Sequence, residues 1–322
     1  MRTQSKLWLL SIGVICSIGM LNGNVVAASS RTTNALWVFS DEVTNQERRS
    51  MLIQRSSTSG VNALYLSVYQ SVPNSSGRLM NEERDIADLV RSARQKKIRV
   101  WAAYGAPDWP TLGCNKEAFP LQRMAEIINY NKANPQSRFQ GVVLDVEPLE
   151  PQSEADFQSL LKLYQCIRSF LPRSLGLTVA IRFFWDTPVT FPTRGEVRPA
   201  YQHIINMNLS QIVVMGYRDV AGSSCPDDGV ICLHQDEIEY ANSHRKKRRI
   251  LVGLETGNCA PDCGPENVTF FEEGQSWLNI QAQNIASHFR KSPSFGGFAI
   301  HRYNDAYLSG LTDWPATNPT FP

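Results

Sequence analysis

Two acidic residues lie two positions apart at the end of an apolar segment, residues 139–147 (FQGVVLDVE). In an extended strand, neighbouring side chains point to opposite faces, so Asp145 and Glu147 share one face while Leu144 and Val146 share the other. Two carboxyl groups in an apolar frame are costly, because burial and mutual repulsion both oppose their ionisation. A carboxyl group with a raised pKa can hold a proton near neutral pH, as general acid catalysis requires. The segment therefore predicts an acid/base site.

Short apolar segments alternate with longer amphipathic segments along most of the chain. The predicted strands are 36–39, 61–69, 98–104, 139–147, 175–184, 211–217, 249–255 and 297–303, and the predicted helices are 81–96, 121–134, 154–170, 236–244 and 273–290. This alternation predicts βαβ units and a parallel sheet. Eight repeats over about 270 residues fit a single (β/α)8 barrel of the α/β class. A doubly wound sheet is the alternative, but no glycine-rich loop follows the first predicted strand.

In a (β/α)8 barrel the active site is built at the C-terminal ends of the strands. The alternation of side chains predicts that one polar set lines this mouth: Asp145, Glu147, Arg182, Tyr217, Glu255, His301 and Tyr303. A purely structural network is the alternative, but delivery of polar residues from several strands to one rim favours a functional site. Arg182 and His301 have two interpretations, charge compensation of the carboxylates or recognition of a polar group on the substrate.

Aromatic side chains near the strand ends are candidates to stack on the ring of a substrate. Trp109 and Trp185 are the strongest, because both lie on long predicted loops above the mouth, and Tyr104 ends the third predicted strand. For each of these residues, packing in the core is an equally good explanation. A metal site made by His301, Asp145 and Glu255 is a further alternative, but a single histidine among oxygen donors is thin evidence. We predict neither a metal nor a cofactor.

The N-terminus has the features of a secretory signal peptide: Arg2 and Lys6, then the apolar residues 7–21 and a small-residue cleavage site. We therefore expect a signal peptide at 1–28 and one barrel domain at 29–322. The mature protein would be secreted or periplasmic, without stable membrane insertion.

The six cysteines after the expected signal peptide predict disulfides in an exported chain. Short loops favour Cys225–Cys232 and Cys259–Cys263, which leaves Cys114–Cys166. A net charge of +2, with 42% hydrophobic residues, is typical of a globular protein and gives no signal for nucleic acid. The basic run 244–249 lies between a predicted helix and strand, where a solvated turn explains it better than a nucleic-acid site. We expect a monomer.

Residues 139–147 resemble the fourth-strand motif of the family 18 chitinases, F-D-G-x-D-x-D-x-E, without gaps. The resemblance implies that Glu147 is the general acid and that Asp145 orients the N-acetyl group of the substrate. Met215 and Tyr217 match the M-x-Y motif on the sixth strand of that family, where it contacts the acetamido group. His301 corresponds to the aromatic residue on the eighth strand of that family.

Two departures from this motif leave the mechanism open. Gln140 and Val143 replace the first two aspartates, so the acid that usually shares a proton with Asp145 is missing. A second resemblance, to the retaining barrel hydrolases, implies Glu147 as acid/base and Glu255 as nucleophile. In a retaining pair the carboxyl groups lie ~5–5.5 Å apart, against ~6.5–9.5 Å in an inverting pair.

These features predict an exported glycoside hydrolase that cleaves a polysaccharide or glycan, with Glu147 as the general acid. The alternative is a chitinase-like, carbohydrate-binding barrel without catalysis. The replaced acids at Gln140 and Val143 favour this alternative, and the presence of Glu147 opposes it. A barrel hydrolase or lyase acting on a non-sugar substrate is a third interpretation, because a fold does not dictate a function.

Overall fold

The computed structural model describes residues 32–39, 41–68, 83–147, 153–191, 195–225, 229–258 and 266–303. The expected signal peptide at 1–28 lies outside these ranges, as do Cys259 and Cys263. Within the described ranges, no helix combines the length and the hydrophobicity that a membrane span requires.

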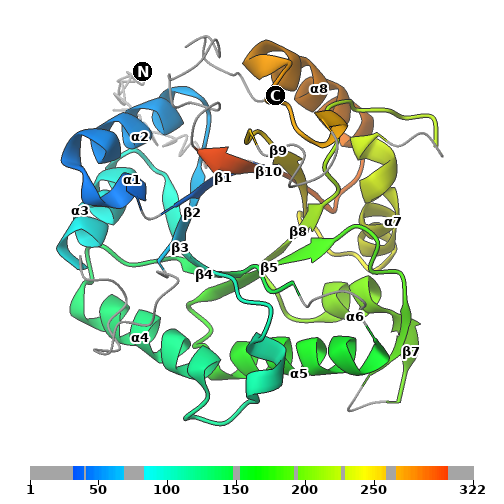
Figure 1. Cartoon of the computed structure of the whole chain (residues 1–322), viewed down its shortest axis with the longest axis horizontal. Coiled ribbons are helices and arrows are strands. Elements are labelled where there is room, and N and C mark those ends of the chain that lie inside the picture. Colours follow the sequence, from blue (N-terminus) through cyan, green and yellow to red (C-terminus); the bar gives the residue numbers. More distant parts are fainter. Residues whose placement is uncertain are drawn as a thin grey trace, which may run out of the picture. The chain divides into compact units, whose positions relative to one another are not determined.

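Eight parallel strands form a closed barrel, and this confirms the (β/α)8 fold predicted from the sequence (Figure 1). All eight predicted strands are present, and they neighbour one another in chain order around the barrel. Their bounds are β1 Thr33–Val38, β2 Ala63–Ser67, β3 Arg99–Tyr104, β4 Gly141–Leu144, β5 Gly176–Arg182, β8 Gln211–Met215, β9 Ile250–Glu255 and β10 Phe295–Tyr303.

The helices surround the strands as an outer ring (Figure 1). They are α1 Asp41–Thr44, α2 Gln46–Thr58, α3 Glu83–Gln95, α4 Phe119–Ala133, α5 Glu154–Phe170, α6 Ala200–Asn206, α7 Val230–Ser243 and α8 Gly274–Phe289. Two 3₁₀ turns, Trp109–Leu112 and Glu266–Val268, and a small antiparallel hairpin, β6 Pro188–Thr190 with β7 Val197–Pro199, complete the described elements.

Three of these helices and the hairpin were not predicted, and α7 begins six residues before the predicted start at 236. The α2 segment, QERRSMLIQRSST, has few apolar residues, so its periodicity is weak. Its start is instead defined by Asn45, whose side chain accepts hydrogen bonds from the N–H groups of Glu47 and Arg48 at 2.9 and 3.1 Å. The α6 helix has seven residues, too few for a clear helical pattern.

Two apolar layers hold the barrel together. Side chains such as Leu177, Val179 and Ile181 alternate outward and pack beneath the helices, as predicted. The lumen holds a smaller cluster that includes Val143, Ala180 and Trp101. The indole of Trp101 lies against the first residues of β4 and β5. Both residues are glycines, and a Cβ atom on either one would collide with the indole. This packing leaves the opposite, C-terminal ends of the strands for a cavity.

Two of the predicted disulfides are present, Cys114–Cys166 and Cys225–Cys232. The first joins the loop before α4 to α5, across 52 positions of sequence. The second closes a short loop that leads into α7.

Candidate active site

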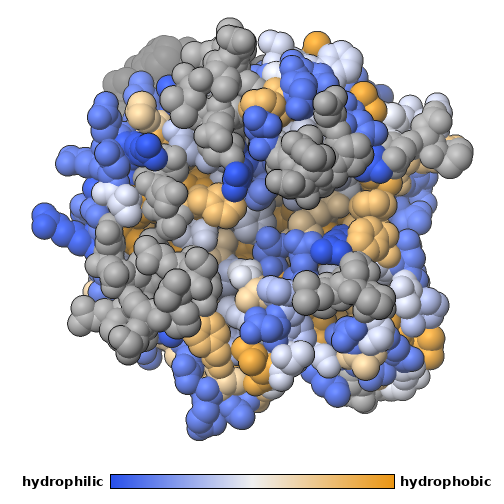
Figure 2. Space-filling view, viewed as in Figure 1, coloured by the Kyte–Doolittle hydropathy of each residue, from blue (hydrophilic) through white to orange (hydrophobic). Residues whose placement is uncertain are grey.

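A cavity of about 430 Å³ lies at the C-terminal ends of the strands. Its lining combines carboxylates, cations and apolar side chains: Trp37, Asp145, Glu147, Arg182, Phe184, Met215, Tyr217, Glu255, Val268 and His301. In the space-filling view, hydrophobic and hydrophilic residues lie next to one another over the middle of the molecule (Figure 2). Such a mixed surface suits a ligand with both apolar faces and hydroxyl groups.

The two acids of the fourth repeat enter this cavity from just beyond β4. The strand ends at Leu144, three residues earlier than predicted, but the N–H of Asp145 still donates to the carbonyl of Tyr104 at 2.7 Å. Leu144 and Val146 pack in the outer apolar layer, so Asp145 and Glu147 alternate to the lumen side. The structure therefore brings both acids to one cavity.

Asp145 is the carboxyl group that its surroundings keep protonated. Its pKa is raised to about 7, first by burial and then by the nearby charge of Glu147, while His301 and Arg182 partly oppose this rise. Its Oδ1 atom is buried and has no hydrogen-bond partner among the described residues. A neutral Asp145 can donate a hydrogen bond as well as accept one, so it is ready to contact a polar group of a ligand.

Glu147 forms an ion pair with Arg182, whose Nε donates to its Oε2 at 2.6 Å. Both side chains keep contact with solvent, with exposed fractions of 34% for Glu147 and 26% for Arg182. The guanidinium also lies over the ring of Phe184, 5.6 Å from its centroid. These contacts fit the interpretation that Arg182 compensates the charge of the acids.

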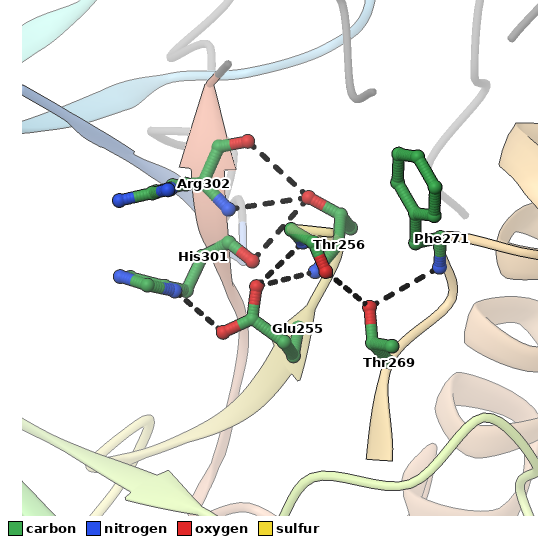
Figure 3. A network of polar contacts seen from close by, with 7 residues as sticks. Glu255, Thr256, Thr269, Phe271, His301 and Arg302 are labelled. Carbon is green, nitrogen blue, oxygen red and sulfur yellow. Dashed lines mark hydrogen bonds and ion pairs between the residues drawn. The ribbon is translucent and has the colours of Figure 1, made fainter. Parts of the chain in front are cut away.

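Glu255 and His301 form a second close pair of polar side chains, shown in Figure 3. The register of β9 and β10 puts these two residues side by side. His301 Nδ1 lies 2.5 Å from Glu255 Oε2, and the N–H groups of Thr256 and Gly257 donate to Glu255 Oε1 at 2.9 and 2.6 Å. Both carboxylate oxygens of Glu255 are therefore occupied by donors from its own chain.

Tyr217 follows β8 and lines the same cavity as the carboxyl groups of Asp145, Glu147 and Glu255. Its pKa lies well above the ordinary value of tyrosine, because of burial and then the charges of Glu255, Asp145 and Glu147. The phenol is therefore neutral and available as a hydrogen-bond donor. Gly253 makes room for it, since a Cβ atom there would lie 3.0 Å from the Tyr217 ring and 2.6 Å from the carbonyl oxygen of Val214.

Four residues predicted to bind substrate do not line the cavity: Tyr104, Trp109, Trp185 and Tyr303 belong to the outer apolar layer. The ring centroids of Trp109 and Tyr104 lie 5.8 Å apart, and Trp185 is fully buried, 5.5 Å from the ring of Phe157. The register between β1 and β10 shifts before Tyr303, which pairs with Val38. After this shift the side chain of Tyr303 packs in the outer layer and no longer points into the lumen. Tyr104, Trp109 and Trp185 pack as core, which is the alternative that the sequence left open, whereas the prediction that Tyr303 faces the lumen is wrong.

Phe184 is a cavity residue that the sequence analysis missed. Its side chain is 44% exposed, and it lies two residues after Arg182, with which it shares the cavity. The same alternation that turns Arg182 inward would have identified it, had the aromatic search not been confined to tryptophan and tyrosine. Phe39, 36% exposed, contacts the ring of His301 at 5.7 Å between centroids and adds a second aromatic group beside this cavity.

No cluster of three or more histidine, cysteine, aspartate or glutamate side chains in the described ranges has the geometry to hold a metal ion. The metal site left open above, with His301, Asp145 and Glu255, therefore gains no support. The short contact between Glu255 and His301 instead identifies these residues as partners of each other.

The fold is a (β/α)8 barrel, similar to the barrels of the family 18 chitinases. Similar solved structures include a chitinase from Bacteroides thetaiotaomicron, with 15% identity, 87% of this chain and 94% of that chain covered, and a TM-score of 0.57. A family 18 chitinase from Cycas revoluta in complex with (GlcNAc)3 shares 14% identity over 87% of this chain and 97% of that chain, with a TM-score of 0.57.

The spore cortex-lytic enzyme SleL of Bacillus cereus is a third similar structure, at 12% identity and a TM-score of 0.56, with 90% of this chain and 74% of that chain covered. No protein-family model matches the sequence, and no curated protein matches it either. At these identities the likeness extends to the fold, which agrees with the fold that the fourth-strand motif implied.

Proposed function

We propose that this protein is an exported glycoside hydrolase that cleaves a glycan containing N-acetylglucosamine, with Glu147 as the general acid. The observation that carries the proposal is the pair of acids at the end of β4, in a cavity where burial raises the pKa of Asp145 to about 7. Export is supported by the predicted signal peptide at 1–28 and is compatible with the two disulfides.

The chemistry follows from the charges of the site. The charge of Glu147 helps to raise the pKa of Asp145 to about 7, so near neutral pH Asp145 can hold a proton and pass it to Glu147. That proton reaches the glycosidic oxygen from Glu147, which lies closer to solvent than the buried Oδ1 of Asp145. Arg182 then stabilises the carboxylate that Glu147 becomes, since its Nε already donates to Oε2.

The substrate class is supported by two further features. Similar structures include chitinases, and one of them was solved with (GlcNAc)3. Met215 and Tyr217, which match the acetamido-contacting motif, both line the cavity, and the neutral phenol of Tyr217 can donate to a carbonyl oxygen.

The decisive experiment is the substitution Glu147→Gln, which keeps the size of the side chain and removes its acidity. We expect kcat on chromogenic and polymeric N-acetylglucosamine substrates to fall by about 10²–10⁴. The thermal midpoint should hardly change, because the lost ion pair is partly exposed. Glu196→Gln is the matched control, since it breaks a comparably exposed ion pair with Arg198 on the hairpin, whose residues do not line the cavity.

Full activity in Glu147→Gln would remove Glu147 from the reaction. A wild-type protein that binds the oligosaccharides but releases no reducing ends would instead be a carbohydrate-binding barrel. Both outcomes are read from the same panel of glycans, by reducing-end release and by calorimetric binding.

A further inference from the structure

Both carboxylate oxygens of Glu255 are held by donors from its own chain. Its side chain is 6% exposed, Oε1 accepts two backbone N–H donors, and Oε2 lies 2.5 Å from His301 Nδ1 (Figure 3). A carboxylate held by three donors is fixed in place, and an attack on a sugar carbon would require it to break one of these contacts. The arrangement suits a group that orients its neighbour.

The neighbour that Glu255 orients is His301. An ionised carboxylate only accepts hydrogen bonds, so the proton between the two groups belongs to Nδ1. Neutral His301 then has its lone pair on Nε2, the nitrogen on the other side of the ring from Glu255. Because His301 lines the cavity, with 28% of its side chain exposed, it is accessible to a ligand there.

The surroundings of the pair restrict its movement. Phe39 and Trp37 contact the imidazole edge to face, at 5.7 and 6.3 Å between ring centroids. Thr256 ties the end of β9 to β10, because its N–H donates to the carbonyl of His301 at 2.6 Å and its Oγ1 accepts from the N–H of Arg302 at 3.1 Å (Figure 3). A histidine held in one orientation and one tautomer is preorganised for proton transfer.

We infer that His301 and Glu255 form a catalytic dyad, in which His301 Nε2 takes a proton from the water that attacks the substrate and Glu255 is the positioning residue. The inference rests on the proposed function and supplies the base that it lacks. The water oxygen bonds to the sugar carbon while its proton passes to Nε2. The glycosidic bond breaks, and its electron pair leaves on the departing oxygen, which takes the proton of Glu147. The imidazolium, stabilised by Glu255, then returns its proton to solvent.

The test replaces Glu255 with Gln. The Gln carbonyl can accept from the N–H groups of Thr256 and Gly257, and its NH₂ group then faces Nδ1 and moves the imidazole proton to Nε2. We expect kcat to fall by about 10³–10⁴ with little change in KM, because the wrong tautomer removes the base. Nitrogen NMR should report the change of tautomer directly, and five histidines in the chain keep the spectrum simple.

A second variant keeps the test valid if Glu255→Gln folds poorly. His301→Ala should lose about 10²–10⁴ in kcat, and added imidazole should restore at least about tenfold. His288→Ala, which removes an exposed histidine on α8, is the matched control and should neither lose activity nor respond to imidazole.

The acidic limb of the kcat/KM profile should also move in Glu255→Gln, because a base must lose its proton before it can act, and a purely structural role would not produce this change. The groups that face His301 from the neighbouring strands, and that titrate beside it, are Asp145, Glu147, Arg182, Tyr217 and Glu255.

Three results would overturn the dyad. The first is wild-type kcat and an unchanged His301 tautomer in Glu255→Gln, while Glu147→Gln is inactive; the proposed function would then stand without the dyad. The second is a covalent adduct on Glu255, trapped by a fluorinated sugar and found by mass spectrometry, which would make Glu255 the nucleophile. The third is a wild-type protein inactive on every glycan, which would remove the proposed function together with the base role of His301.

Discussion

Asp145→Asn should make the protein more stable at high pH, because ionisation of Asp145 opposes folding. Burial raises the pKa of this carboxyl from 3.8 to about 7. The folded protein therefore keeps a proton that the unfolded chain releases. The stability that this proton provides is fully present below about pH 4 and is lost as the pH rises through 7.

The magnitude follows from the two pKa values. A difference of about three pKa units, at about 1.4 kcal/mol each, amounts to about 4 kcal/mol. This is an upper value, since Asp145 is only half-buried as a whole residue and water at the cavity screens part of its charge. Asn cannot ionise, so the variant does not lose this stability as the pH rises. The free-energy difference between variant and wild type should therefore grow by about 2–4 kcal/mol from pH 4 to pH 8.

The assay is urea denaturation of both proteins at several pH values between 4 and 9. The quantity to compare is the increase with pH of the difference in unfolding free energy between Asp145→Asn and wild type. Any effect of the Asn side chain that does not depend on pH cancels in this comparison. Asp108→Asn, which removes an exposed carboxyl from the loop after β3, is the matched control. If the stability curves of wild type and Asp145→Asn run parallel over this range, the burial argument for Asp145 is refuted. We expect the same variant to lose activity, so the site keeps a carboxyl that the fold would be more stable without.

Three further substitutions test the surroundings of the site. Gly253→Ala should cost about 1–3 kcal/mol and lower kcat, because its Cβ would press on the Tyr217 ring and a backbone carbonyl; wild-type stability would contradict this. Phe184→Ala should raise KM for long oligosaccharides up to about tenfold, the equivalent of an aromatic contact, with a stability change below about 0.5 kcal/mol. Ile280→Ala, at a similarly exposed position on α8, should leave KM unchanged. Loss of Cys114–Cys166 should cost about 4 kcal/mol in urea denaturation, against about 2.5 for Cys225–Cys232, because its loop spans 52 positions rather than 7; equal losses would refute the loop-length argument.

The fold could be predicted from the sequence because periodicity is a local signal. Each of the eight strands is an apolar segment of the sequence. Neighbouring side chains in a strand point to opposite faces, so the apolar residues that face the helices also show which polar residues at the strand end face the lumen. Asp145, Glu147, Arg182, Tyr217, Glu255 and His301 were all selected on this basis, and all of them line one cavity. The α2 helix was missed because its polar sequence carries little periodicity, although Asn45 signals its start.

The partners of these residues depended on tertiary structure. Glu255 and His301 are 46 positions apart, and their pairing depends on the register of β9 against β10, which no local pattern encodes. The same reasoning applies to Trp109 and Trp185, because an aromatic residue at a strand end can pack inward or under a helix with similar local sequence.

By itself, the sequence determined the barrel, the acids after its fourth strand and the lumen side of the strands up to the register shift before Tyr303, since these follow from the order and alternation of neighbouring residues. Only the tertiary structure decided that Arg182 pairs with Glu147, that His301 pairs with Glu255 and that Asp145 keeps a buried oxygen. The physical reason is that charge pairing and burial depend on distances between distant parts of the chain, and these distances exist only once the barrel has closed.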